Sequence, residues 1–415
     1  MRTDHRALQR HTATRARTLA TGAARVLVLG AGLLVLHASA PLPTHAQDVA
    51  TGGDETLTVR GILSTTLFAN DQLFAPGNGQ NAIWAAPPDD ADDSWYHGAD
   101  VRATRLGLDF NGPDVSGDWR VGGTIEVDFF GGVVGTGAFS DEQPMLRLRL
   151  GYIDLTNGRT TLRVGQAWSP TFGFAPESLS RIGFAHGWAG GGLIGWRLPG
   201  VFLYHDLSSD GPTTLHLQLA AMRGSWSDDV TPDGVSAGEA SSVPQLEARL
   251  EARHAPAGAP SWEAFVAGHY DRKDLDGAGV DGDDSLDGWT VNGGVRIRPE
   301  PFTLIANAYV GEAAGQIFAH ILQFGDFGGW GANGQLGFDL TPRWSIWGLY
   351  GIDDPDDDAP QRLQNQVVTG MLRYQVRQYA AALEWHRITT DHRIPLAGET
   401  SVSGNQLALS VRYTF

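Results

Sequence analysis

Apolar and polar residues alternate with a period of two along most of this chain, and this pattern limits the possible folds more than any other feature. In the segment 119–129 the odd-numbered positions are mostly apolar, and the even-numbered positions include Glu126 and Asp128. The segments 246–253 and 406–415 alternate in the same way. Because successive side chains of a β-strand point to opposite faces, each segment predicts a strand with one apolar and one polar face. The chain is therefore predicted to be all-β.

Two architectures produce this alternation. A soluble sandwich or filled barrel buries its apolar face, whereas an outer-membrane barrel turns that face to lipid and keeps its charges in a wet lumen. Aromatic residues recur at the predicted strand ends, among them Trp119, Tyr152, Trp289, Trp344 and Tyr413. Such residues form the interfacial girdles of membrane barrels, and the 54 glycines, many of them within strands, also fit a barrel. We expect a transmembrane antiparallel β-barrel.

Residues 1–46 have the pattern of a cleaved secretory signal peptide. Six arginines precede an apolar run from Val26 to Leu36, and cleavage after Ala46, at Thr44-His45-Ala46, is favoured over cleavage at Ala38-Ser39-Ala40. The alternative, a single anchoring helix, needs an apolar run of about 20 residues. Cleavage leaves a barrel of residues 47–415 with 24 basic and 46 acidic residues, a formal charge of -22. That charge repels phosphates, so we expect no nucleic-acid partner.

The connections between the predicted strands alternate between long and short. Long ones are expected near 69–100, 131–144, 169–192, 223–243, 271–287, 312–328, 352–364 and 387–404. Short ones are expected near 111–118, 156–159, 208–212, 255–260, 299–300, 341–342 and 375–377. Outer-membrane barrels have long outer loops and short periplasmic turns, so this rhythm predicts about sixteen strands. Residues 193–207 are interpreted as one strand with an irregularity at Pro199. Sixteen strands enclose an aqueous channel.

The third long connection, residues 169–192, is the candidate constriction loop. It is rich in proline and aromatic residues and less charged than the other outer loops. Its polar residues Glu177, Arg181 and His186 are the expected constriction residues. The alternative is an ordinary surface loop.

Charges on the inward face of the first five strands are the candidate pore lining. The set comprises Arg60, Arg105, Asp109, Arg120, Glu126, Asp128, Arg147, Arg149 and Arg163. Guanidinium groups bind carboxylates through two hydrogen bonds, so a ring of arginines would attract anionic solutes. The alternative is that the inward acids neutralise the arginines in a paired structural ladder.

Several of these segments resemble a known family. Residues 105–110, 123–131, 147–153 and 163–168 look like successive strands of the DcaP-like trimeric porins of Gram-negative bacteria, within the general bacterial porin superfamily. The terminal Val411-Arg412-Tyr413-Thr414-Phe415 is similar to the C-terminal assembly signal of outer-membrane barrels. The resemblance implies a homotrimer of sixteen-stranded channels in lipid and lipopolysaccharide, passing small organic solutes. The segment 47–56 is too short for the coiled-coil extension of some family members.

Two other classes of function remain open. An acid/base pair of Asp391 and His392, with His386 nearby, would favour an outer-membrane hydrolase of the protease or lipase type. A structural or adhesive barrel is the third interpretation. The acidic segment 281–287 has oxygen ligands but lacks the spacing of a calcium loop. The chain has no cysteine, which excludes disulfides, zinc-thiolate sites and cysteine nucleophiles. We expect no catalytic residue, cofactor or metal site.

Overall fold

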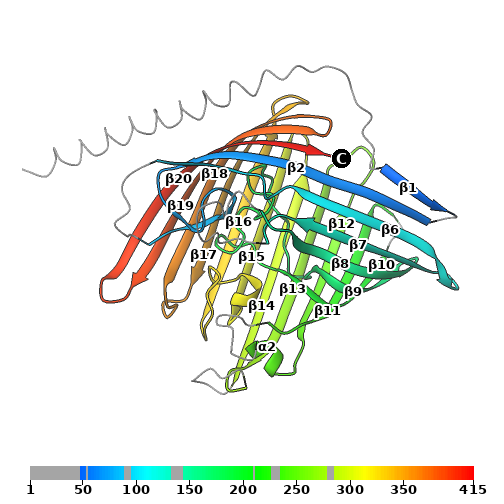
Figure 1. Ribbon diagram of the computed structural model, residues 1–415, viewed down its shortest axis with the longest axis horizontal. Helices are drawn as coiled ribbons and strands as arrows, with labels where there is room; N and C mark the ends of the chain where they lie inside the picture. The colour runs from blue at the N-terminus through cyan, green and yellow to red at the C-terminus, as the bar shows by residue number, and fades with distance from the viewer. Residues whose placement is uncertain are drawn as a thin grey trace, which may run out of the picture.

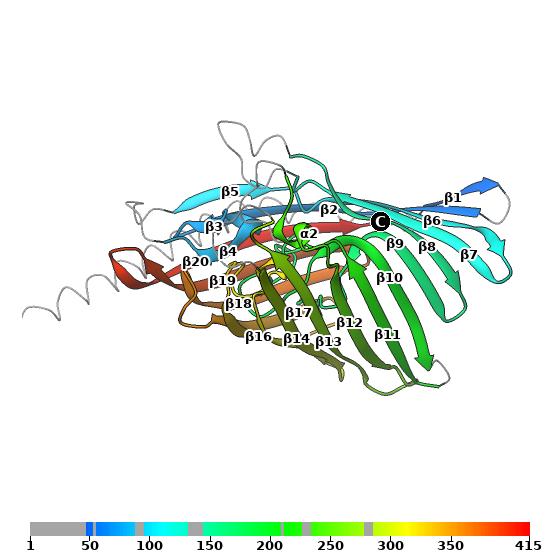
Figure 2. The ribbon, with the colours of Figure 1, turned by 90° about the horizontal axis from the view of Figure 1, so that it is seen from below.

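The structure is a closed antiparallel β-barrel of sixteen strands (Figures 1 and 2). The computed structural model describes residues 47–52, 55–87, 95–131, 144–208, 211–225, 234–277 and 285–415. The predicted signal peptide, residues 1–46, lies outside the described residues. No helix in the described part of the chain is long and apolar enough to cross a membrane.

The barrel strands follow one another in sequence order. They are β2 (Glu55–Asn70), β6 (Arg105–Ser116), β7 (Trp119–Asp128), β8 (Arg147–Asn157), β9 (Thr160–Trp168), β10 (Arg197–Ser208), β11 (Thr213–Met222), β12 (Gln245–His254), β13 (Ser261–Asp274), β14 (Ser285–Arg298), β15 (Phe302–Glu312), β16 (Gly328–Asp339), β17 (Trp344–Pro355), β18 (Arg362–Val376), β19 (Tyr379–Ile394) and β20 (Gly398–Thr414). The predicted strand number is confirmed.

The first and last strands close the barrel. Strand β2 pairs with β20 on one side and with β6 on the other, and Figure 2 shows blue β2 beside red β20. A short strand, β5 (Tyr96–Asp100), extends the line of β6 along β2. The backbones of Gly61 and Phe415 exchange two hydrogen bonds of 2.8 and 3.0 Å. Strand β1 (Gln47–Gly52) pairs with the start of β2.

The burial pattern is the reverse of that in a soluble protein. Large apolar side chains such as Ile125, Leu148 and Val266 are exposed on the outer face. Polar side chains of the same strands, such as Glu126 and Arg149, are buried inside. A soluble sandwich or filled barrel would bury the first set, so the structure rules it out.

The connections that follow β2, β7, β9, β11, β13, β15, β17 and β19 share one end of the barrel, which we call the loop end, and the others share the opposite end, which we call the turn end. Three predicted boundaries are wrong. Strand β6 continues to Ser116, through most of the predicted turn 111–118. Strand β10 begins at Arg197, and residues 193–196 belong to the preceding loop. Most of residues 387–404 is strand, because β19 and β20 continue to a turn at 395–397.

Three of the long connections fold inward and pack on one another. The first contains β3 (Phe74–Pro76), a 3₁₀ turn η1 (Gly79–Asn81) and β4 (Ala82–Ala85); the third is residues 169–196; the sixth is 313–327, with a 3₁₀ turn η3 (Gly315–Ile317). Ile83, Trp188 and Ile321, one from each, share an apolar cluster. The fourth, 223–244, instead holds a one-turn helix, α2 (Ala237–Ala240), capped by Ser236.

Candidate functional site

The loop 169–196 lies inside the barrel, hydrogen-bonded to inward side chains of the strands opposite its origin. Asn292 of β14 donates to the Thr171 carbonyl oxygen over 2.7 Å. Asn307 of β15 accepts from the Phe174 backbone N–H at 2.8 Å and donates to the carbonyl oxygen of the same residue at 2.9 Å. These polar side chains hold a backbone that has no partner within a strand ladder.

The strongest of these anchors is Glu384 of β19, a fully buried carboxylate. Its Oε1 accepts the backbone N–H groups of Leu179 and Ser180, both at 2.8 Å. Its Oε2 accepts the hydroxyls of Ser178 at 2.6 Å and Ser180 at 3.0 Å. One charged group therefore satisfies four donors of the loop.

The returning limb of the loop approaches the opposite wall closely. Gly190 and Gly191 accept hydrogen bonds from Asn365 of β18 and Asn333 of β16, at 2.5 and 3.2 Å. Gly192 follows with φ +81°, and a Cβ there would lie 2.2 Å from the backbone nitrogen of Ala332. Only glycine fits this approach without displacement.

The three predicted constriction residues each contact a different part of the interior. Glu177 forms a 3.2 Å ion pair with Arg373 of β18. Arg181 is buried and donates to the Gln80 carbonyl oxygen at 2.9 Å. His186 Nε2 lies 3.4 Å from Glu384 Oε2, and burial lowers the pKa of His186 from its ordinary value.

Most of the predicted pore-lining charges meet in one ion-pair network on β2, β6, β7 and β8. Its members are Arg60, Arg105, Asp109, Glu126, Asp128, Arg147 and Arg149. Arg60 pairs with Asp109 and Glu126, both at 2.6 Å. Arg149 joins Glu126 to Asp128 at 2.8 Å each, and Arg147 adds a 2.7 Å contact to Asp128. The arginines are thus paired with the inward acids, but four cations face three carboxylates.

Arg197, at the start of β10, adds a further cation beside this network. Its guanidinium lies over the rings of Trp168 and Trp196, 4.8 and 4.3 Å from their centroids. It is buried, and its Nε and Nη1 have no hydrogen-bond partner among the residues that the structure describes.

Arg163 and Arg120 lie apart from the network. Arg163 of β9 pairs with Asp154 at 2.7 Å and stacks on Tyr152, 3.5 Å from the ring centroid. Arg120 lies beside the short turn after β6, where it pairs with Asp114 at 3.2 Å. Both members of that pair are largely exposed.

A cavity of about 540 Å³ separates the start of the loop from the turn end of the barrel. Its charged lining consists of Arg163, Arg249, Arg253, Arg296, Glu251 and Glu263. Much of the remaining lining is aromatic and consists of Tyr152, Trp168, Phe172, Phe174 and Tyr204. Four arginines face two glutamates here, so the lining carries a net positive charge.

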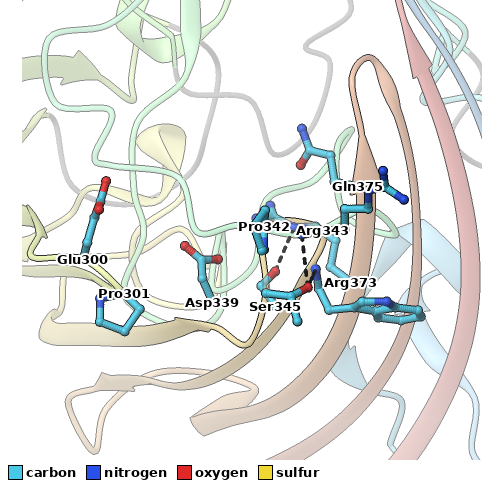
Figure 3. A pocket seen from close by; sticks show the side chains of 10 residues that line it. Glu300, Pro301, Asp339, Pro342, Arg343, Ser345, Arg373 and Gln375 are labelled. Carbon is cyan, nitrogen blue, oxygen red and sulfur yellow. Dashed lines mark hydrogen bonds between the residues drawn. The ribbon is translucent and has the colours of Figure 1, made fainter.

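A second cavity of similar volume, about 540 Å³, opens at the turn end near β16, β17 and β18. Glu300 and Asp339 lie on one side of it and Arg373 on the other, where Arg373 Nε donates to the Ser345 hydroxyl over 3.2 Å (Figure 3). The lining mixes both signs of charge.

The predicted acid/base pair does not form. Asp391 and His392 are successive residues of β19, so their side chains point to opposite faces of the strand. His392 Nε2 lies 2.8 Å from the Ala85 carbonyl oxygen, so that ring nitrogen is already engaged in a hydrogen bond. Of the acidic segment 281–287, residues 281–284 lie outside the described part, and 285–287 begin β14.

Several interior residues were not singled out from the sequence, above all Glu384, Arg197 and the cavity arginines Arg249, Arg253 and Arg296. A signal existed for Arg249 and Arg253, which lie on the polar face of the segment 246–253. Glu384 gives no comparable signal, because its function as an anchor depends on a loop about 205 residues earlier in the chain.

The sequence matches no protein-family model and no curated protein. The structure is similar to that of the outer membrane channel DcaP of Acinetobacter baumannii, with a TM-score of 0.65 and 23% identity over 87% of this chain and 97% of that chain. This chain therefore shares the β-barrel fold of that protein. The anion-selective porin of Comamonas acidovorans superposes with a TM-score of 0.53 and 14% identity, over 87% of this chain and all of that one. OmpT of Vibrio cholerae gives a TM-score of 0.51 and 11% identity, over 88% of this chain and all of the other.

Proposed function

We propose that this chain is an outer-membrane porin, a passive diffusion channel for small hydrophilic solutes that prefers anions, including carboxylates. The observation that carries the proposal is the arginine-rich cavity enclosed by a barrel with an apolar exterior. A low-dielectric wall around a charged lumen favours solutes of the opposite sign.

The placement of the loop 169–196 supports the same function. It crosses the lumen between the ion-pair network and the inner face of β19, where Glu384 fixes it. Solutes would pass beside this loop and its residues Glu177, Arg181 and His186. Of the nine predicted pore-lining residues, seven belong to the ion-pair network. Arg163 lines the cavity, and Arg120 lies at the turn end of the barrel.

The similar structures support this assignment by analogy. One is titled an outer membrane channel and another an anion-selective porin. A structure of Vibrio cholerae OmpT with a TM-score of 0.50 is described as a trimer form. We propose a homotrimer in the outer membrane of a Gram-negative bacterium, with residues 1–46 directing export and then being removed.

Charge reversal in the cavity tests the anion preference. Replacing Arg253 and Arg296 together with glutamate changes the formal charge of the cavity lining from +2 to -2. In planar bilayers with a potassium chloride gradient, the wild-type reversal potential should lie toward the chloride equilibrium potential. The double variant should shift it toward that of potassium, because the lining charge sets the preferred sign.

Arg272→Glu is the matched control. Arg272 is exposed and lies at the loop end of β13, outside the cavity, with Asp287 3.9 Å away. The control should retain the wild-type reversal potential. Chloride preference that persists unchanged in the double variant would contradict the assignment of selectivity to this cavity.

A further inference from the structure

Two histidines and a glutamate converge where the inward loop meets β19. His186 comes from the loop, and Glu384 and His386 are two residues apart on the inward face of the strand. Suitable ligand atoms of the three residues lie within 4.8 Å of one another, and all three side chains are buried. The imidazole rings lie side by side, with centroids 4.9 Å apart.

The spacing is close to that of a bound divalent transition metal. Donor atoms about 2.1 Å from a tetrahedral zinc ion lie about 3.4 Å from one another. His186 Nε2 and Glu384 Oε2 are already 3.4 Å apart, and His386 Nε2 is 3.9 Å from the same oxygen. The donor atoms of the two imidazoles lie within 4.8 Å of each other, so closing the set around one ion requires side-chain shifts of about 0.5–1.4 Å.

The donors also have the appropriate chemistry. Two imidazoles and one carboxylate suit zinc and neighbouring divalent ions, and such sites keep a fourth position for water or another ligand. The hydroxyl of Ser180 lies 3.1 Å from His386 Nε2 and 3.0 Å from Glu384 Oε2, two of the proposed ligand atoms. His386 Nδ1 is buried and has no partner within the described residues.

We propose that His186, Glu384 and His386 form a binding site for a divalent transition-metal ion, with zinc as the representative. The ion would join the loop to β19 by coordination in addition to the four hydrogen bonds to Glu384. Conformational freedom of the loop inside the barrel would decrease. This proposal does not rest on the porin function, since metal binding is measurable without transport.

A purely hydrogen-bonded cluster is the competing arrangement. In that case an imidazole N–H of His186 donates to the Glu384 carboxylate, and no ion is required. Arg181 opposes a bound cation, because its buried guanidinium interacts electrostatically with Glu384 and with both histidines. Removing the charge of Arg181 should therefore strengthen metal binding, whereas the hydrogen-bonded cluster predicts no saturable metal binding with or without that charge.

Calorimetric titration of the folded full-length barrel in detergent with zinc chloride tests the site. The protein should carry no histidine tag and should first be treated with a chelator. We expect saturable binding of one zinc per chain. His186→Gln and His386→Gln should each weaken the affinity at least about tenfold, and Arg181→Gln should strengthen it.

His392→Gln is the matched control, since His392 is buried on the same face of the same strand, outside the cluster. It should bind zinc with wild-type affinity. Absence of saturable binding to the folded wild-type protein would overturn the proposal, whatever the variants do. An equal loss of zinc affinity in the His392 variant would also overturn the proposal. The conductance of these proteins tests only the porin function, so the two proposals can fail separately.

Discussion

Replacing Glu384 with alanine should release the loop 169–196 from the barrel wall. The carboxylate accepts four hydrogen bonds from Ser178, Leu179 and Ser180, and its removal leaves these buried donors without their acceptor. Each buried donor left unpaired costs about 1–3 kcal/mol, so we expect a loss of at least about 3 kcal/mol in the free energy of unfolding. Single-channel recordings should show larger and noisier currents.

The matched control is Leu383→Ala on the neighbouring, outward-facing position of the same strand, where the side chain is exposed. It should leave the current amplitude and noise unchanged. Urea unfolding followed by tryptophan fluorescence compares the stability of the two variants. An alanine variant at 384 with wild-type currents and wild-type stability would show that the loop does not depend on this anchor.

Gly192→Ala should displace the returning limb of the loop. The added Cβ would lie 2.2–2.5 Å from three backbone atoms of Ala332, and φ of +81° adds strain for any other residue. Overpacking of this kind costs about 1–3 kcal/mol. We expect a lower midpoint of urea unfolding and faster cleavage of the loop by a protease of broad specificity.

Gly334→Ala provides the control, because a Cβ on Gly334 of β16, two residues from Ala332, meets no atom within 4 Å. This variant should unfold and be cleaved like the wild-type protein. Equal effects of the two substitutions would indicate that loss of glycine, and not the close approach at Gly192, causes the change.

The barrel could be predicted from the sequence because its determinants are local. Alternation in segments such as 119–129 assigns each side chain to a face, and the lengths of the connections give the strand number. The errors fall where this signal is weak. Polar residues occupy both faces of 387–394, so the segment lacks the apolar stripe that marks a strand, yet it pairs along its whole length with β20.

The interior could be predicted only in part. Glu126 and Arg149 belong to strands whose faces were assigned, so either pairing or attraction of anions was expected, and the structure contains the pairs. The contact between His186 and Glu384 joins residues about 198 positions apart. It depends on the path of the loop across the lumen, which no local pattern encodes.

Conductance of the purified, folded barrel in a planar lipid bilayer tests the central claim most directly. A hollow, charged interior predicts discrete ionic current steps, grouped in threes for a trimer, with a reversal potential on the chloride side in a salt gradient. A correctly folded protein that inserts and conducts no ions would contradict the claim and favour a structural or adhesive barrel.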